Sequence, residues 1–356
     1  MRLFVVFIFV FLVLNGIVVT GMARHVVPQN FRLFFTGLLI FLSTFQYMYQ
    51  FLSSRFVSSF PYKVNQTLSY IVYYYMGFVI YASAFFIVAA GLTWIFKGKI
   101  EFNFYKAAFI LILLVLGAGT YFKHSTVVVE YEIDSGGKLA APMDVVLISD
   151  THLGFINENA SMKKLSKMIN KLNPDAVLIA GDLIDFHLDP VLERDMLSEL
   201  KNIDSRIFFA VGNHEIYGGK TDLLVKTLNE YPNVEAVRDS KVLLENGVYI
   251  AARDNFSKKP IKEILEGSGE SPVIIMQHTP DTIDEAVENN VLLQVSGHTH
   301  KGQIFPGRLF TKRLFKVDYG HKKIKDTNII VSQGYGTWGP PIRVGSRSEI
   351  VLIKIK

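Results

Sequence analysis

Four stretches without a single charged residue occupy most of the first 125 positions of this 356-residue chain: Leu3–Ala23, Leu33–Ser54, Val64–Phe96 and Ala107–Phe122. A helix needs about 20 apolar residues to cross a hydrocarbon core of about 30 Å, and the first three stretches reach that length. Val64–Phe96 is too long for a charge-free buried helix of a soluble protein. We therefore expect an all-α transmembrane bundle of about four helices in residues 1–125. The expected spans lie near 3–21, 33–53, 68–95 and 105–122.

The composition of these stretches favours an anchor over a transporter. Charged side chains in the middle of a span are typical of ion and proton pathways, and these spans carry none. Asn15, Gln46 and Gln50 are predicted to form hydrogen bonds between helices. A cleaved signal peptide is the alternative for the first stretch. Its apolar segment is longer than the usual 7–15 residues or so, and it lacks a convincing cleavage site.

The Lys and Arg residues between the spans leave the orientation nearly balanced. One side of a four-span bundle would carry Arg2, Arg55, Lys63 and Lys123. The other side would carry Arg24, Arg32, Lys97, Lys99 and Lys106. We expect a multi-pass protein of the cell membrane, with a slight preference for an extracytoplasmic catalytic domain. The absence of cysteine is compatible with either side.

The second half of the chain contains five polar clusters, each of which follows a short apolar run. The clusters are Asp150-Thr-His152, Gly181-Asp-Leu-Ile-Asp185, Gly212-Asn-His-Glu215, His278 and Gly297-His-Thr-His300. The preceding runs are rich in Val and Ile, which is typical of buried strands. Polar groups at the carboxyl ends of such strands occupy the usual ligand position of open α/β sheets. Five of the nine histidines lie in these clusters, so we expect one shared site.

The residue types in the clusters suit a pair of divalent ions. A carboxylate can bridge two cations that lie about 3.5–4 Å apart, as phosphoester cleavage by two metals requires. Imidazoles, further carboxylates and an amide oxygen suit manganese, iron or zinc. Structural zinc held by thiolates is excluded because the chain has no cysteine. Each cluster alone has a simple alternative, since Asp-x-His and Gly-Asp are common in loops.

In this order, the clusters resemble the calcineurin-like metallophosphoesterases, whose signature is D-x-H, G-D-x-x-D, G-N-H-[DE], a lone His and G-H-x-H. The resemblance implies that Asp150, His152, Asp182 and His300 hold one metal. Asp182 would bridge to a second metal, which Asn213, His278 and His298 would complete. His214 would donate a proton to the leaving oxygen or stabilise the transition state, and Asp185 and Glu215 would orient the ligands. Two divalent ions are the implied cofactor, manganese first, with iron, zinc or a mixed pair as alternatives.

The resemblance covers Met143 to the C-terminus and implies a four-layer α/β/β/α sandwich for residues 143–356. Residues 126–142 would form a linker with a strand at Thr126–Asp134. Helices are expected at Ala160–Leu172, Pro190–Lys201, Lys220–Tyr231, Pro260–Glu266 and Asp281–Asn289. We further expect a β meander from Val234 to Ala251. A half-buried strand is expected at Glu349–Ile355 because its apolar residues alternate.

Gln-His-Thr-Pro and Gly-His-Thr-His-x-Gly-Gln resemble a membrane-associated branch of this family, often described as phosphodiesterases or phosphohydrolases. The branch usually has Gly where this chain has Lys301, so Lys301 is a candidate substrate contact. Arg343 is a second candidate, on a loop expected beside the metals. The segment Gly334–Gly339 matches G-x-G-x-x-G. A dinucleotide site is rejected because Pro340-Pro341 follows where a helix is needed.

Eight of the nine charged residues between Lys301 and Lys325 are basic, and aromatic residues lie among them. This segment is either a solvated basic loop or a cap that attracts anionic headgroups or a phosphorylated substrate. The expected function is a membrane-anchored phosphoesterase that hydrolyses a phosphodiester or pyrophosphate of a lipid-linked or membrane-proximal substrate. The alternatives are a hydrolase of the UDP-2,3-diacylglucosamine type from lipid A synthesis and a non-catalytic scaffold. We expect the bilayer as a partner, and neither nucleic acid nor an obligate protein partner.

Overall fold

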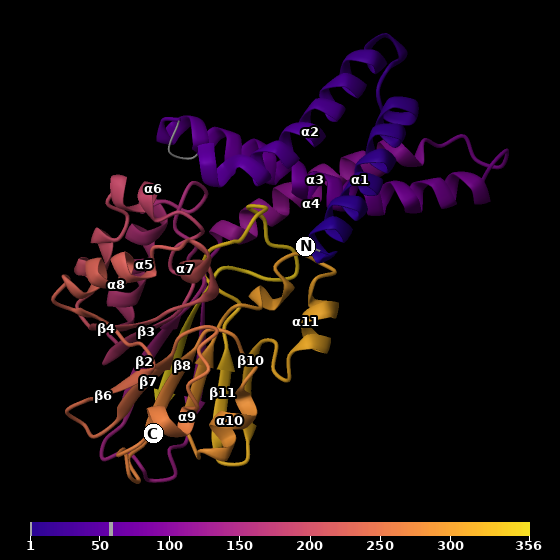
Figure 1. Ribbon diagram of the computed structural model, residues 1–356. Coiled ribbons are helices and arrows are strands. Elements are labelled where there is room, and N and C mark those ends of the chain that lie inside the picture. The colour runs from indigo at the N-terminus through magenta and orange to yellow at the C-terminus, as the bar shows by residue number, and fades with distance from the viewer. Residues whose placement is uncertain (1, 57–59) are drawn as a thin grey trace. The chain divides into compact units, whose positions relative to one another are not determined.

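The computed structural model describes residues 2–56 and 60–356, with side chains for residues 9–49 and 60–356. The chain divides into two compact units (Figure 1). One contains Met1–Tyr121 and Gly339–Ile342, and the other contains Phe122–Trp338 and Arg343–Lys356. The first unit is helical and the second contains both sheets, so the charge-free part of the sequence and the part with the polar clusters lie in different units.

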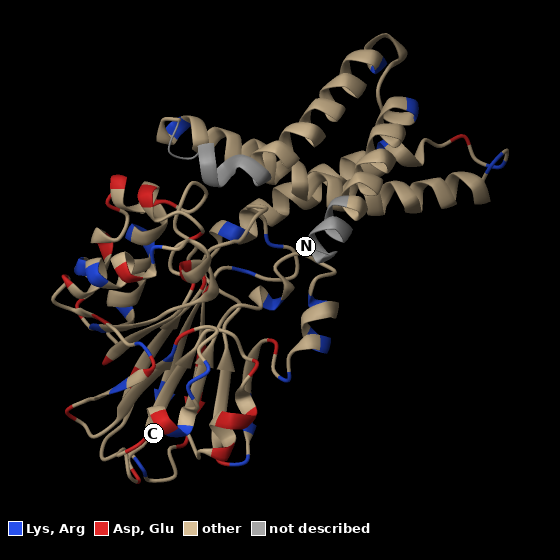
Figure 2. Cartoon of the chain, viewed as in Figure 1, with Lys and Arg blue, Asp and Glu red and all other residues tan. Residues whose placement is uncertain are grey.

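Four helices of the first unit are long and apolar enough to cross a membrane. They are α1 (Arg2–Gly21), α2 (Arg32–Phe56), α3 (Tyr62–Ile95) and α4 (Phe104–His124). Figure 2 shows that Lys and Arg lie at the helix ends and in the connections. Ala107–Phe122, the shortest of the charge-free stretches, is extended at its start by Phe104, Tyr105 and Lys106. The boundaries of the four helices therefore lie close to the charged residues that separate the apolar stretches.

One predicted polar contact is present inside this bundle. The Oδ1 atom of Asn15 on α1 accepts hydrogen bonds from Ser43 Oγ on α2 and Tyr75 Oη on α3, both at 2.6 Å. Gln46 is buried, but its Oε1 atom has no partner among the described residues. The side chain of Gln50 lies outside the described residues. Asn15 thus joins three helices, as expected of a polar residue in a span.

The second unit consists of two six-stranded sheets. The first sheet has the order β1-β12-β2-β3-β4-β5. Its strands are β1 (Val127–Ile133), β12 (Glu349–Ile355), β2 (Met143–Ile148), β3 (Ala176–Ala180), β4 (Arg206–Ala210) and β5 (Val234–Ala236). The second sheet has the order β10-β11-β9-β8-β7-β6. Its strands are β10 (Gly320–Ile324), β11 (Thr327–Val331), β9 (Leu293–Ser296), β8 (Val273–Gln277), β7 (Tyr249–Arg253) and β6 (Ser240–Leu243). Within each sheet, the strands that precede the clusters run parallel to one another.

The two sheets face each other across one apolar core. Leu147, Leu178 and Phe208 from the first sheet pack with Ile274 and Val295 from the second, and all are fully buried. Helices cover the outer faces (Figure 1). The helices of this unit are α5 (Asn159–Leu172), α6 (Leu188–Glu193), α7 (Asn213–Tyr217), α8 (Thr221–Asn229), α9 (Ile261–Ile264), α10 (Ile283–Glu288) and α11 (Arg308–Leu314). This is the predicted four-layer α/β/β/α arrangement.

The local sequence explains how an outer helix is placed. In α5, the buried residues Met162, Leu165 and Ile169 recur at helical spacing, so one face packs on the sheet. The helix ends at Leu172, and the next residue, Asn173, has a φ of 44° in the left-handed region and is followed by Pro174. Asparagine tolerates this conformation better than most residues, and proline prevents the helix from continuing. The chain then reverses and enters β3, which runs parallel to β2.

Three sequence-based expectations about local structure are wrong, and a fourth segment departs from one of its two alternatives. The segment Val234–Ala251 is not a meander, because β5 pairs with β4 while β6 and β7 pair in the other sheet. The strand β12 is almost completely buried, because it lies between β1 and β2 and is covered on both faces. The helix predicted at Pro190–Lys201 is interrupted at Asp195, whose φ is 49°. The basic segment after Lys301 is not a loop throughout, since it contains α11 and β10.

Candidate metal centre

The polar clusters meet at one edge of the sandwich, because they follow the carboxyl ends of β2, β3, β4, β8 and β9. Contacts between the sheets prove the convergence. His278 Nε2, after β8, lies 3.0 Å from Asp182 Oδ2, after β3. The backbone N–H of His298, after β9, donates to Asp150 Oδ2, after β2, at 3.1 Å. All seven predicted metal ligands therefore lie in one connected group of side chains.

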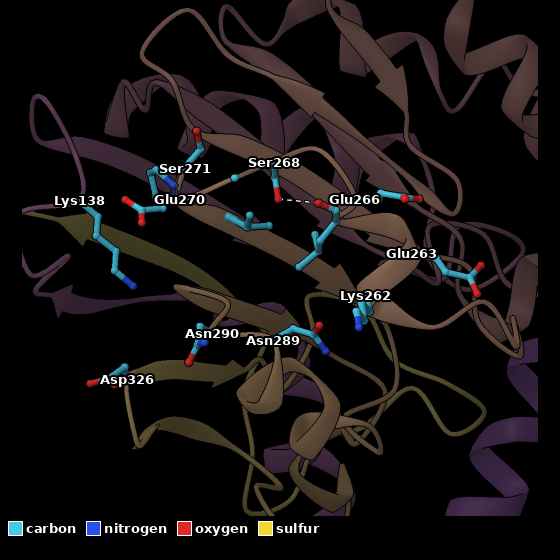
Figure 3. Close-up of a pocket in the computed structure, with 14 residues that line it drawn as sticks. Lys138, Lys262, Glu263, Glu266, Ser268, Glu270, Ser271, Asn289, Asn290 and Asp326 are labelled. Atoms are coloured by element: carbon cyan, nitrogen blue, oxygen red, sulfur yellow. Dashed lines mark hydrogen bonds between the residues drawn. The ribbon is translucent and has the colours of Figure 1, made fainter.

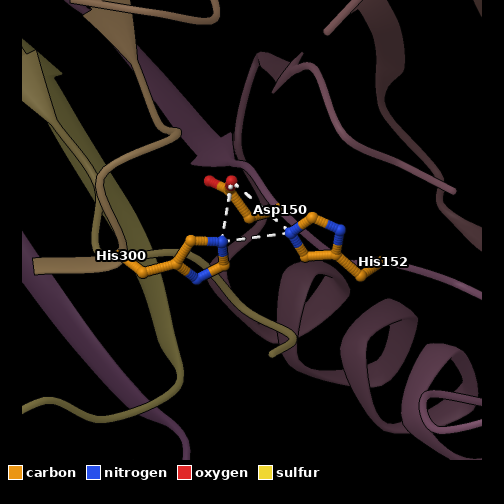
Figure 4. A group of neighbouring side chains, drawn as sticks. All are labelled: Asp150, His152 and His300. Atoms are coloured by element: carbon orange, nitrogen blue, oxygen red, sulfur yellow. Dashed lines mark hydrogen bonds and ion pairs between the residues drawn. The ribbon is translucent and has the colours of Figure 1, made fainter. Parts of the chain in front are cut away.

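Asp150, His152 and His300 form the first metal-ligand group (Figure 4). The Nε2 atoms of the two histidines are only 3.0 Å apart. Asp150 Oδ1 lies 3.2 Å from His300 Nε2 and 3.7 Å from His152 Nε2. All three side chains are buried. Two ring nitrogens and a carboxylate oxygen that face one another in this way suit a shared cation.

Asp182, His278 and His298 form the second group. The ring of His278 is fixed by a 2.8 Å contact between its Nδ1 atom and the carbonyl oxygen of Ala180. A carbonyl accepts only from an N–H, so the proton lies on Nδ1 and Nε2 faces Asp182. The Oδ1 atom of Asn213 lies 2.9 Å from His298 Nδ1. This separation fits a hydrogen bond or two ligands of one ion.

Asp182 lies between the two groups, as a bridging carboxylate should. Its Oδ2 atom is 3.0 Å from His278 Nε2 and 4.0 Å from His152 Nε2. Its Oδ1 atom accepts from the backbone N–H of His214 at 2.9 Å, which fixes the carboxylate plane. The site also passes a test of fit, because the Nε2 atoms of His152 and His300 face each other and Asp150 Oδ1, while His278 Nε2 faces Asp182 Oδ2. Imidazole nitrogens and carboxylate oxygens that face one another suit divalent ions.

The electrostatics of the group favour the protonation states that metals require. Burial and the positive charge of His278 lower the pKa of His298 to about 4. Burial also lowers the pKa of His300 to about 4, although Asp150 opposes the shift. For Asp150 and Asp182, burial alone would raise the pKa, but the neighbouring histidines reverse this and hold both values below the ordinary range. Two anionic carboxylates and two neutral imidazoles result.

The pKa of His278 shifts in the opposite direction to those of His298 and His300. Burial would lower its pKa, but the charge of Asp182 and the hydrogen bond to it raise the pKa to about 10. A cation bound at Nε2 would displace this proton and take its place beside Asp182. Metal binding at this position is therefore expected to release a proton.

Glu215 holds the backbone around the bridging carboxylate. It is fully buried, and its Oε2 atom accepts from the backbone N–H groups of Asp182 and Gly212, at 3.0 and 2.8 Å. Its Oε1 atom accepts from the N–H of Ile184 at 3.0 Å. Burial and the charge of Asp182 raise the pKa of Glu215 to about 7. Glu215 thus ties the turn after β3 to the turn after β4, in keeping with its predicted orienting role.

Glycine and left-handed backbone make this packing possible. A Cβ atom on Gly212 would lie 2.2 Å from Asp182 Oδ1, and one on Gly297 would lie 2.3 Å from Asp150 Oδ2. Asp150, His152, Asp182, His298 and His300 all have a φ between 46° and 68°. Such conformations cost on the order of 1–3 kcal/mol each and cluster at functional sites. The surrounding fold therefore keeps these side chains in position against a local preference.

His214 lies beside the bridge and forms a pair with Asp185. Its Nδ1 atom is 3.1 Å from Asp185 Oδ1, and its Nε2 atom is 3.9 Å from Asp182 Oδ2. Burial would lower the pKa of His214, but the hydrogen bond to Asp185 and the nearby carboxylates raise it overall. A third possible ligand group, His152 with Asp185 and His214, shares these atoms. The paired arrangement suits a protonated imidazole that faces the metal positions.

The two predicted substrate contacts have different surroundings. Lys301 is partly exposed, and its Nζ atom lies 4.1 Å above the ring of Tyr319. Arg343 is fully buried, and its Nη2 atom donates to the carbonyl oxygens of Gly334, at 2.9 Å, and Gly336. Arg343 has no exposed face for a substrate, so the predicted substrate contact is replaced by a structural role. It holds the loop that contains the G-x-G-x-x-G match.

Several residues of the site were not predicted. Ser149 donates to Asp150 Oδ2 at 2.5 Å. The rings of Phe186 and Tyr217 lie 4.4 and 6.1 Å from that of His214, and Tyr217 is exposed. The sequence carries a signal for both aromatic residues. Phe186 directly follows Asp185, and Tyr217 lies three residues after His214, on the same face of α7.

A separate cavity of about 790 Å³ opens at the other end of β8 (Figure 3). Its lining includes Lys138, Lys262, Glu270 and Asn290. Val273, the first residue of β8, also lines the cavity. None of the predicted metal ligands lines it. Its size alone does not make it a catalytic site.

Comparison with known proteins identifies the domain that carries this centre. Residues 143–302 match the family model for calcineurin-like phosphoesterases. This domain belongs to the calcineurin-like metallophosphoesterase family. The matched residues include every predicted metal ligand as well as His214 and Lys301.

Several relatives share the metallophosphoesterase domain. A "Transmembrane protein with metallophosphoesterase domain" from Danio rerio is 29% identical over 233 residues, which cover 60% of this chain and 53% of that protein. An "Uncharacterized metallophosphoesterase" from Helicobacter pylori is 33% identical over 228 residues, which cover 61% of each chain. This chain thus spans less than two thirds of the length of these relatives. A dimetal phosphatase structure from Danio rerio matches with a TM-score of 0.37 and 12% identity, over 55% of this chain and 89% of that one.

Proposed function

We propose that the protein is a membrane-anchored phosphoester hydrolase that depends on two divalent metal ions. The observation that carries the proposal is the position of Asp182 between two ligand groups at one edge of the sandwich. Asp150, His152, Asp182 and His300 would hold one ion, and Asp182, Asn213, His278 and His298 the other. Manganese is the first candidate, followed by iron, zinc or a mixed pair. Bound at this site, the two ions supply Lewis-acid stabilisation of the phosphoryl oxygens and an activated water.

The chain's own residues supply the proton for the leaving group. The hydrogen bond to Asp185 helps to raise the pKa of His214, and its Nε2 atom faces Asp182 Oδ2 at 3.9 Å. A protonated imidazole at this position can donate its proton to the leaving oxygen as the ester bond breaks. Asp185 fixes the ring orientation through Nδ1, and Phe186 packs against the ring. Glu215 keeps the turn around Asp182 rigid through three backbone contacts.

The proposed substrate class is a lipid-linked or membrane-proximal phosphodiester or pyrophosphate. Two observations support it: the four candidate spans in the same chain and the exposed aromatic side chain of Tyr217 beside His214. A pyrophosphate of the UDP-2,3-diacylglucosamine type is a specific member of this class. The relatives named as transmembrane proteins fit a multi-pass location in the cell membrane. We propose an extracytoplasmic catalytic domain from the slight imbalance of Lys and Arg.

A non-catalytic scaffold is the competing function. Loss of a metal histidine or of the proton donor would favour it, and this chain retains His152, His214, His278, His298 and His300. Hydrolysis of an aryl phosphodiester by the purified full-length protein, with and without manganese, separates the two. We expect metal-dependent turnover. Protein that binds metal but turns over no phosphoester, including those of a membrane lipid extract, would instead support the scaffold.

A further inference from the structure

The short helix α11 (Arg308–Leu314) presents its apolar residues to solvent. Leu309, Phe310 and Leu314 are 52%, 61% and 75% exposed. At about 100° per residue, Phe310 and Leu314 are neighbours on one face of the helix, and Leu309 and Arg313 adjoin them. A surface helix of a soluble domain normally buries its apolar face. In α11 that face points away from the protein.

The opposite face of α11 is held to the sandwich by polar contacts. Thr311 Oγ1 donates to Asp318 Oδ2 at 3.1 Å, and Arg308 Nε lies 3.5 Å from the same oxygen. Asp318 is buried, and its carbonyl oxygen accepts from Thr299 Oγ1 at 2.7 Å. Because polar residues attach this helix, its apolar residues are left free for another contact.

Two aromatic residues outside the helix have similar exposure. Phe305 precedes the helix and Trp338 lies in the loop before Gly339, and they are 59% and 47% exposed. Gln303 connects the two segments, since its Nε2 donates to the carbonyl of Trp338 and its Oε1 accepts from the N–H of Trp338, at 2.8 and 2.9 Å. We call Phe305, Leu309, Phe310, Leu314 and Trp338 the apolar cap. It is attached to ordered backbone at both segments.

The exposed charged residues of α11 itself are basic. Lys312 and Arg313 lie on α11 and are exposed, and Figure 2 shows basic residues along this helix. No acidic residue occurs between Lys301 and Val317. Exposed Leu and Phe next to Lys and Arg are typical of helices that lie in the interface of an anionic bilayer. Attraction to anionic lipids adds to the burial of the apolar side chains.

We propose that the apolar cap inserts into the surface of a bilayer that contains anionic lipid, as a membrane contact additional to the four candidate spans. The chain's own spans supply a bilayer, so the cap needs no separate recruitment. The proposal does not depend on the reaction that the metal centre performs. The expected effect of docking on the metal centre does rest on the proposed function. The ring of Phe315, next to α11, lies 5.9 Å from that of the predicted ligand His298, so docking would bring headgroup phosphates near the metals.

The chain contains no cysteine, so a single introduced thiol can report on the cap. Phe310→Cys in the full-length protein is labelled with an environment-sensitive fluorophore and reconstituted into vesicles. The vesicles consist of phosphatidylcholine alone or of phosphatidylcholine with phosphatidylglycerol. Quenching is measured with a nitroxide on the lipid acyl chain and with iodide on both sides of the membrane. Leu243→Cys is the matched control, because Leu243 is exposed to a similar degree but lies on β6.

We expect the label at position 310 to be quenched several-fold more by the lipid nitroxide than the label at 243, and less by iodide. The difference should be larger with phosphatidylglycerol and should shrink when Leu309 and Leu314 are also changed to Ser. Equal behaviour of the two labels would overturn the proposal. So would shielding of position 310 from both quenchers, which would indicate that protein covers the cap. Equal lipid quenching in neutral and anionic vesicles would overturn the role of charge.

Discussion

Buried polar side chains occur in both units of this protein, but the groups that surround them differ. In the helical unit, Asn15 Oδ1 receives hydrogen bonds from Ser43 and Tyr75, and its Nδ2 donates to Phe11. In the sandwich, the Nε2 atoms of His152 and His300 are equally buried, but they face each other at 3.0 Å and lie 3.7 and 3.2 Å from Asp150 Oδ1. A satisfied network stabilises a fold, whereas ring nitrogens and carboxylate oxygens that converge on one point suit a cation. The contrast separates structural from functional polarity.

The largest expected effect comes from removing the bridge. Asp182→Ala leaves both ligand groups without their shared carboxylate, so we expect loss of metal binding and of all metal-dependent phosphodiester hydrolysis. The protein should still fold, as circular dichroism would show, because the apolar core does not include this residue. Asp189→Ala, which removes an exposed carboxylate paired with Lys220, is the matched control and should retain activity. Undiminished turnover in Asp182→Ala would contradict the two-metal mechanism.

Loss of the proton donor should slow the reaction without emptying the site. We expect His214→Ala to reduce kcat by roughly 10²–10⁴-fold, the usual contribution of a general acid. Metal content, measured on the same preparation, should not change. If metal is lost together with activity, His214 is a ligand, and the third group with His152 and Asp185 is the one that binds.

A smaller effect is expected on the pH profile. The hydrogen bond to Asp185 helps to raise the pKa of His214. As a general acid, His214 acts while protonated, so activity should fall as the pH rises through its pKa. Asp185→Asn lowers that pKa and should move the alkaline limb of kcat to lower pH. Asp189→Asn is the control and should leave the limb in place, and an identical shift in both variants would disprove the pairing.

The sequence could predict the site because each ligand directly follows a recognisable apolar strand. What it could not show depends on contacts between distant segments. The strand β5 and the strands β6 and β7 look alike as apolar runs, yet they belong to different sheets. Arg343 follows a Gly- and Pro-rich loop that resembles a ligand-binding loop. Its guanidinium, however, donates hydrogen bonds to carbonyl oxygens of that loop. Which strands pair in a sheet, and whether a single charged side chain is buried, both depend on segments that are far apart in the sequence.

The smallest effect on activity should come from the satisfied network in the helical unit. Asn15→Leu removes the acceptor for Ser43 and Tyr75 and should cost about 1 kcal/mol of unfolding free energy in detergent or lipid. Turnover by the folded fraction should remain unchanged. Thr44→Val is the control, because Thr44 is on the same helix as Ser43 but its hydroxyl donates to the carbonyl oxygen of Ile40 in the preceding turn. A loss of activity at constant stability would show that the helical unit contributes to catalysis.

The metal content of the purified full-length protein tests the central claim most directly. Mass spectrometry of the metals should find two divalent ions per chain after loading with manganese. His300→Ala should lose the ion of the first group and His278→Ala that of the second, so each variant should retain about one. Wild-type protein that binds no divalent ion, or variants that retain both, would contradict the assignment of two ligand groups joined by Asp182.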